Sequence, residues 1–83
     1  MKLKFSFKEQ REFETIDNDI ALLEKQMKDN EAEQELYSTD YIKLQEISEE
    51  YQRLEEQLDE KMERWIYLND LAEQIEQQNK EKK

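Results

Sequence analysis

The feature that most constrains this chain is an unbroken heptad pattern in a sequence with no glycine and no proline. Between residues 44 and 75, side chains of the seam recur at alternating steps of three and four. This spacing is typical of the a/d seam of a coiled coil. It predicts a long helix over residues 40–78 that packs against a second helix. The seam consists of Leu44, Ile47, Tyr51, Leu54, Leu58, the polar Lys61, Trp65, Leu68, Ala72 and Ile75.

A shorter seam comes first, and it becomes polar toward its end, at Asn30 and Gln34. Between the two seams, residues 37–40 contain helix-capping side chains, and Ser38 or Thr39 is expected to cap the long helix. With Ser38 as the cap, Tyr37 and Ile42 would form a hydrophobic staple. So short a turn predicts an antiparallel hairpin in which the numbers of facing residues sum to about 76. The shorter seam consists of Ile16, Ile20, Leu23 and Met27.

Residues 1–6 read as an extended lead-in or the end of a linker, and Ser6 with Glu9 forms the S-x-x-E capping box of a helix that begins at Phe7. Thr15 and the polar residues after it suggest a break, which divides this region into a short helix over 7–14 and a helix over 15–36. Residues 79–83 form a tail. The predicted fold is an all-α, antiparallel two-stranded coiled-coil hairpin with a short extra N-terminal helix, in a single domain over residues 1–83.

The composition excludes several kinds of site. Charged residues make up 43% of the chain, and there is no cysteine and no histidine. Disulfides, thiolate catalysis and zinc sites therefore drop out, and we expect no catalytic residue, no metal and no cofactor. No apolar run is long enough to cross a bilayer, so we expect no membrane-spanning segment. A hairpin of this kind is expected to be a monomer when isolated.

The net charge of −10 is unevenly distributed. The acidic residues dominate the middle of the chain, and the basic residues gather at its two ends. A hairpin brings these ends together, which predicts a basic base, an acidic shaft and a polar tip. The base is a candidate for contact with nucleic-acid phosphates; the alternative is charge balance at helix ends. Its cations are Lys2, Lys4, Lys8, Arg11, Lys80, Lys82 and Lys83.

The tip is a second candidate contact surface, because two tyrosines there are able to stack on unpaired bases. The alternative is that these residues only cap and staple the second helix. Lys43 is the tip's one cation, beside Asp40, and three glutamates stand just behind the turn. This charge does not favour phosphate contact at the tip. The candidate residues are Tyr37, Ser38, Thr39, Tyr41 and Lys43.

Two stretches resemble a known family. Residues 3–20 contain Phe7, then K-E-Q-R-E over residues 8–12, then Phe13 and Glu14. Residues 36–73 contain a Y-x-x-D-Y turn, K-L-Q-E at the start of the long helix and E-R-W at residues 63–65. Together these motifs resemble the C-terminal domain of ABC-F ATPases of the Uup-like kind, over nearly the whole chain.

The resemblance implies a cytoplasmic parent ATPase with two ATP-binding cassettes and no membrane domain, linked to the ribosome and translation. It also implies that this domain is a DNA-binding coiled-coil hairpin at the end of that parent. A chain without glycine has no G-x-x-x-x-G-K-[ST] loop, so ATP hydrolysis belongs to other parts of the parent. We therefore expect a non-catalytic arm that binds DNA or ribosomal RNA and contacts its own cassettes. The alternative is a purely structural coiled coil for protein docking or dimerisation.

Overall fold

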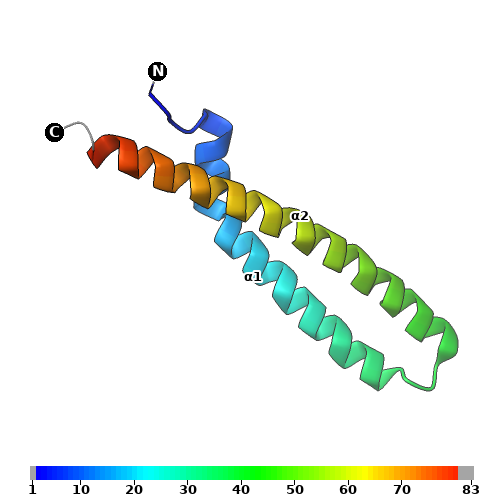
Figure 1. The fold of residues 1–83 in the computed structure, drawn as a ribbon. Helices are drawn as coiled ribbons and strands as arrows, with labels where there is room; N and C mark the ends of the chain where they lie inside the picture. Colours follow the sequence, from blue (N-terminus) through cyan, green and yellow to red (C-terminus); the bar gives the residue numbers. More distant parts are fainter. Residues whose placement is uncertain (1, 81–83) are drawn as a thin grey trace.

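The computed structural model describes residues 2–80 and consists of two antiparallel helices. Helix α1 spans Phe7–Leu36, helix α2 spans Tyr41–Lys80, and residues 37–40 join them at one end (Figure 1). The molecule is a rod with extents of 65 × 16 × 15 Å. The all-α hairpin predicted from the two seams is confirmed.

The core is a single row of side chains between the helices. Its buried apolar members all come from the two predicted seams, and Ile16 and Leu68 are the most deeply buried, at 1% and 0% exposure. The pairs Glu12–Arg64 and Glu9–Tyr67 match the predicted register, whereas Lys61 meets Asp19, a few residues beyond it. The buried apolar residues are Ile16, Leu23, Ile47, Leu54 and Leu68.

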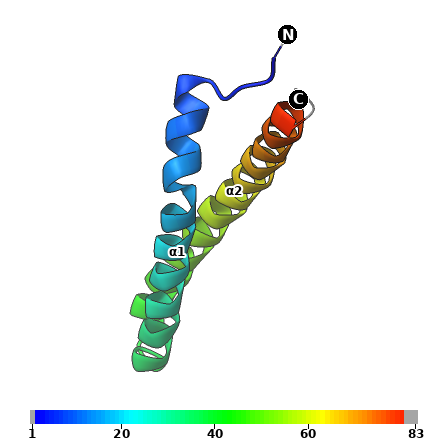
Figure 2. The same ribbon diagram turned by 90° about the vertical axis from the view of Figure 1, so that its left-hand side faces the viewer.

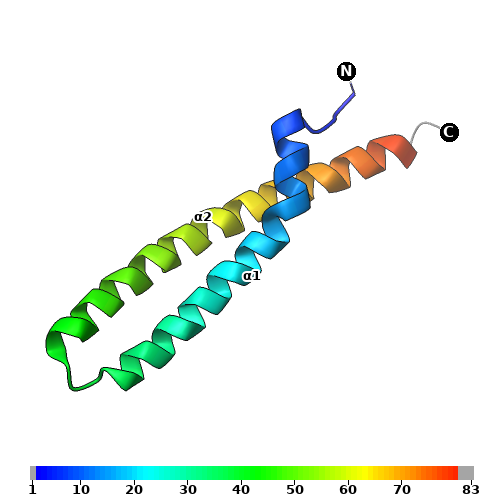
Figure 3. The same cartoon turned by 180° about the vertical axis from the view of Figure 1, so that it is seen from behind.

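Helix α1 is continuous, so the predicted division into helices over 7–14 and 15–36 is wrong. The polar residues that suggested a break have other partners. The Thr15 hydroxyl donates to the carbonyls of Arg11 and Glu12 at 3.4 Å, and Asp17 accepts a hydrogen bond from Trp65. Ile16 between them is buried in the core and fixes this turn as helix. Figures 1 and 3 show a change of direction in α1 instead, and hydroxyl bonding to the preceding turn is a known cause of bends.

The base of the hairpin is the end where both termini lie. Figure 2 shows the helices splaying apart there, with residues 2–6 running from the start of α1 toward the end of α2. The side chain of Gln78 holds this lead-in, because its amide accepts from the Leu3 backbone N–H at 2.7 Å and donates to the Leu3 carbonyl at 3.0 Å. Phe5 packs on Phe13 with ring centroids 5.1 Å apart, and so ties the lead-in to α1.

The turn at the tip differs from the prediction in its cap. Asp40, and not Ser38 or Thr39, caps α2, because its carboxylate accepts from the Lys43 backbone N–H at 3.1 Å. The predicted staple is also absent from the described turn, since Ile42 is 73% exposed. The physical reason is that with Asp40 as the cap the two staple positions are Thr39 and Leu44, so Tyr37 and Ile42 no longer occupy them.

Candidate nucleic-acid interface

The K-E-Q-R-E motif at the start of α1 divides into an inward and an outward set. Its two acids turn toward α2: Glu9 accepts from the Tyr67 hydroxyl at 2.8 Å, and Glu12 accepts two bonds from the Arg64 guanidinium at 2.7 and 2.8 Å. The guanidinium also lies 4.8 Å from the centre of the Tyr67 ring. We call Glu9, Glu12, Arg64 and Tyr67 the base clasp, because they join the first turns of α1 to α2.

The clasp perturbs the acids that form it. Hydrogen bonds from the Arg64 guanidinium lower the pKa of Glu12. The pKa of Glu9 is lowered first by the Ser6 backbone N–H of the capping box and then by the Tyr67 hydroxyl. The same contact raises the pKa of Tyr67, because ionisation would place a phenolate against the Glu9 carboxylate. Both carboxylates are therefore stabilised as anions by partners inside the hairpin, and the Arg64 guanidinium also balances the charge of Glu12.

The cations of the same motif face solvent. Lys8 and Arg11 are exposed, and they are neighbours on one side of α1 because they lie three residues apart. Phe7 is 77% exposed, and the Arg11 guanidinium lies 5.7 Å from the centre of its ring. Within residues 2–80, neither Lys8 nor Arg11 belongs to an ion pair. An unpaired basic pair and an exposed aromatic ring thus stand together at the N-terminal end of α1.

The other basal cations are distributed between the lead-in and α2. Lys2 and Lys4 are exposed on the lead-in, on either side of the residue that Gln78 holds. Lys80 pairs with Glu76 at 3.6 Å, so its charge is partly balanced. Lys82 and Lys83 lie outside the described residues. We call Lys2, Lys4, Phe7, Lys8 and Arg11 the basal patch.

The candidate residues of the tip do not form one surface. Tyr37 is half-buried, and the Lys43 ammonium lies 5.4 Å from the centre of its ring. Ser38 and Thr39 are exposed in the turn, and Tyr41 is 82% exposed at the start of α2. The structure therefore joins Tyr37 to Lys43 and leaves Tyr41 apart from that pair.

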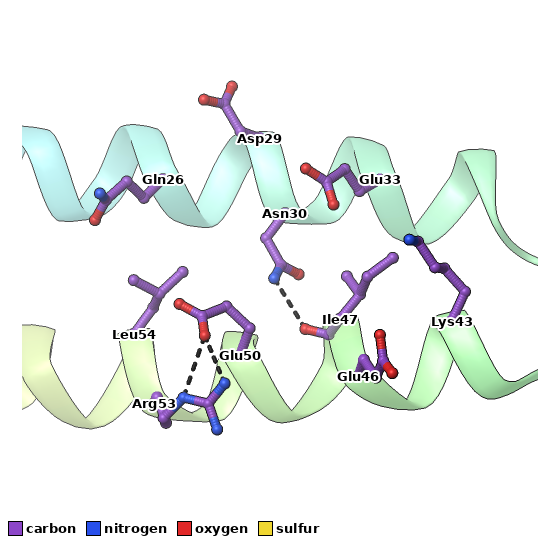
Figure 4. Close-up of a pocket in the computed structure, with 10 residues that line it drawn as sticks. All are labelled: Gln26, Asp29, Asn30, Glu33, Lys43, Glu46, Ile47, Glu50, Arg53 and Leu54. Carbon is purple, nitrogen blue, oxygen red and sulfur yellow. Dashed lines mark hydrogen bonds and ion pairs between the residues drawn. The ribbon is translucent and has the colours of Figure 1, made fainter.

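One side of the shaft carries a groove of about 450 Å³ between the helices (Figure 4). Asn30 crosses it to donate to the Ile47 carbonyl at 2.9 Å, and Arg53 pairs with Glu50 at 2.6 Å. Four carboxylates line the groove against two cations, which opposes phosphate binding there. The charged lining residues are Asp29, Glu33, Lys43, Glu46, Glu50 and Arg53.

Two seam residues have polar partners that the register alone did not identify. The register sum of about 76 predicts Lys61 near Glu14 and Asp17, whereas its ammonium pairs with Asp19 at 3.3 Å. The same register predicts Trp65 near Phe13; the Trp65 Nε1 donates to Asp17 at 2.8 Å, and the residue is 36% exposed. Both contacts lie a few residues from the predicted register.

Sequence reasoning missed the base clasp and Phe7. The predicted register sum of about 76 already places Glu12 opposite Arg64 and Glu9 opposite Tyr67, so the facing opposite charges of Glu12 and Arg64 were a usable signal. For Phe7 the register gave a wrong prediction, because it placed Phe5 and Phe7 beside Leu68 and Leu71, whereas Phe7 is 77% exposed. A first-turn aromatic reads equally well as core or surface until the direction of α1 is known.

The clasp joins the two motifs that carry the family resemblance, K-E-Q-R-E on α1 and E-R-W on α2. Residues 4–70 match the family described as ABC transporter C-terminal domain. The chain belongs to this family. The match is to a C-terminal domain and not to an ATP-binding cassette, so this domain is not itself the ATPase.

A curated relative supports the family membership. The chain is 34% identical over 73 residues to the uncharacterized ABC transporter ATP-binding protein YfmR of Bacillus subtilis (strain 168). The alignment covers 88% of this chain and 12% of that relative, so the chain spans a small part of the relative's length. No solved structure matches the chain. Neither helix of the domain, over residues 7–36 and 41–80, has an apolar stretch sufficient to traverse a bilayer.

Proposed function

We propose that this domain is a non-catalytic nucleic-acid-binding arm of a cytoplasmic, Uup-like ABC-F ATPase linked to the ribosome and translation. The observation that carries the proposal is the division of the K-E-Q-R-E motif. Its acids are held inside the hairpin by Arg64 and Tyr67, while Lys8 and Arg11 stand exposed. The basal patch is therefore the contact surface, and ribosomal RNA or DNA is the partner.

Electrostatics supports the base over the shaft and the tip. The chain as a whole repels phosphates, with a net charge of −10. Exposed charges more than about 10 Å apart are largely screened at 0.1 M salt, so local charge decides where a phosphate settles. Four cations of the basal patch are exposed at one end of a 65 Å rod. The acidic shaft would keep the rest of the rod away from the nucleic acid and so orient the arm.

The aromatic member of the basal patch adds a second kind of contact. An exposed ring beside cations is a common arrangement for binding single strands, in which bases stack while Lys and Arg contact the backbone. Phe7 is exposed, and Arg11 lies against its ring. The base is thus suited to unpaired nucleotides as well as to duplex phosphates.

The arm's second proposed partner is its own parent. The relative is described as an ATP-binding protein, and this chain corresponds to 12% of its length. We infer that ATP hydrolysis takes place in cassettes outside this domain and that the arm anchors them to nucleic acid. The lead-in, held by Gln78, would set the angle at which the rod leaves the cassettes.

The test is fluorescence anisotropy of the 83-residue domain with a labelled single-stranded RNA 20-mer and a labelled DNA duplex. We expect log affinity to fall linearly with log salt concentration, because bound cations release counterions. The double variant Lys8→Glu/Arg11→Glu should weaken binding at least tenfold. The control Lys25→Glu/Lys28→Glu changes the net charge equally on the exposed shaft of α1 and should have a much smaller effect.

Two results would contradict this function. One is no retention of either nucleic acid at 25 mM salt by the wild-type domain. The other is an equal loss of affinity in the basal and shaft variants, which would mean that only total charge matters. The alternative of a dimerising coiled coil is tested by light scattering, where we expect a monomer of 10.3 kDa.

A further inference from the structure

We propose that the apolar tip of the hairpin docks onto a protein surface that offers an apolar pocket surrounded by lysine or arginine. We call Leu36, Tyr41 and Ile42 the tip patch. This partner is separate from the nucleic acid proposed for the base, because the tip lies at the other end of a 65 Å rod. The proposal does not depend on the base binding anything.

The three side chains of the tip patch are large and apolar, yet most of their surface is exposed to solvent. Leu36 is 74%, Tyr41 82% and Ile42 73% exposed, and all three lie within seven consecutive residues. Single exposed apolar side chains are normal on a protein surface, but a group of large ones at a protruding end is typical of an interaction site. Tyr41 also lines a shallow hollow of about 240 Å³ with Leu44, Gln45 and Ser48, which extends the patch along α2.

The fold does not need these three side chains. The end of α1 is closed by the Tyr37 backbone N–H, which donates to the Glu33 carbonyl at 2.9 Å. The start of α2 is closed by Asp40, which caps the Lys43 N–H. Polar side chains at positions 36, 41 and 42 would leave both closures intact, so stability does not explain the patch.

The surrounding charge identifies the kind of partner. Residues 31–50 contain seven acidic side chains and one basic one, Lys43, which lies against the Tyr37 ring. Nucleic acid is repelled by such a surface, and so is the identical tip of a second copy. A protein pocket with a basic rim complements both the apolar tip patch and the acidic side chains of residues 31–50 around it.

The size of the patch limits the strength of the contact. A stable interface buries roughly 800 Å² on each partner, whereas a fully buried aromatic side chain accounts for about 150–250 Å². Three side chains therefore give a weak contact alone. It gains strength when the rest of the parent is already bound nearby, because tethering raises the effective concentration of the tip.

The experiment is photocrosslinking in living cells of the host, with the full-length parent carrying Ile42→p-benzoylphenylalanine. We expect a protease-sensitive, nuclease-resistant adduct whose mapped site on the partner is an apolar residue with Lys or Arg as neighbours. The control places the same photoreactive residue at Gln52, which is exposed on the shaft, and should give no such adduct. An adduct without this mapped chemistry counts against the proposal.

A second experiment tests whether the tip patch makes the contact. With the crosslinker at position 42, Leu36→Ser/Tyr41→Ser should lower the adduct yield at least fivefold, while Leu22→Ser/Ile66→Ser, which removes two exposed apolar side chains of the shaft, should not change it. Circular dichroism of the isolated domain confirms that the serine variant keeps its helices. A nucleic-acid adduct, an adduct with a second copy, no adduct at position 42, or a yield unchanged by the serine pair would overturn the proposal.

Discussion

The base and the tip of this hairpin expose opposite kinds of charge. At the base, the acids Glu9 and Glu12 are bonded within the fold and the cations Lys8 and Arg11 face solvent. At the tip, residues 31–50 contain seven acidic side chains and one cation, and the apolar side chains of Leu36, Tyr41 and Ile42 are exposed. This comparison shows that the net charge of a rod-shaped domain does not identify its partner. What matters at each end is which charges the fold has already paired.

The two halves also differ inside. Toward the base, Ile16 and Leu68 are fully buried. Toward the tip, the buried seam includes the polar Asn30 beside Ile47, and the Asn30 amide donates to the Ile47 carbonyl and accepts from Gln34. Apolar burial is the dominant stabilising term in folding, and a buried amide contributes only through its hydrogen bonds. The base half should therefore hold the hairpin together while the tip half opens more readily.

The largest expected effect comes from the base core. Leu68→Ala removes a side chain with 0% exposure and should lower the free energy of unfolding by about 2–5 kcal/mol, through lost burial and the cavity left behind. Ile42→Ala at the tip, where the side chain is 73% exposed, should change it by less than about 0.5 kcal/mol. Urea unfolding followed by circular dichroism measures both. Equal losses of unfolding free energy in the two variants would contradict the stated difference between base and tip.

The second largest effect on stability is expected from the cap of α2. Asp40→Ala should cost about 1 kcal/mol, because the Lys43 backbone N–H loses its acceptor. Ser38→Ala is the matched control and should be close to neutral, since Ser38 is exposed in the turn. Hydrogen exchange should show faster exchange confined to the first turn of α2 in the Asp40 variant. The opposite ranking of the two variants would restore Ser38 as the cap.

The base clasp should give a smaller, measurable coupling. A double-mutant cycle on Glu12→Gln and Arg64→Gln should yield about 0.5–1 kcal/mol, because the pair is bidentate but partly exposed. The pair Glu50–Arg53, within α2 alone, should yield about 0.2–0.5 kcal/mol and serves as the control. A clasp coupling no larger than the control would mean that the interhelical pair does not hold the base.

The smallest expected effect is the pH dependence of the stability that the base clasp contributes. The Arg64 guanidinium lowers the pKa of Glu12 below its ordinary value of 4.5, so the folded state favours the carboxylate. The stability gained is complete above about pH 4.5 and is lost as the pH falls through the lower, folded-state pKa. The stability difference between wild type and Glu12→Gln should therefore be constant near pH 7 and shrink toward pH 3. A difference that grows in acid would exclude this linkage.

Local signals in the sequence were sufficient for some features of the fold. The Ser6–Glu9 capping box lies where the S-x-x-E pattern predicts it, because its partners are three residues apart. The helix break predicted at Thr15 was wrong, because the burial of Ile16 and the hydrogen bond between Asp17 and Trp65 override the preference of these polar residues for helix ends. For the candidate site, the sequence located the basic residues at the base, and the exposure of Phe7 required the direction of α1.

The heptad pattern was sufficient to predict that two amphipathic helices pair as a hairpin. Their seams and the short turn admit few other ways to bury the apolar residues. The sequence pattern did not show which charges remain free, because that depends on how the two helices pack. Glu12 and Arg11 are adjacent in the chain, yet one is bonded across the hairpin and the other lies in solvent. That outcome depends on the rotation of each helix about its own axis, which is set by packing across the whole seam and not by any local pattern.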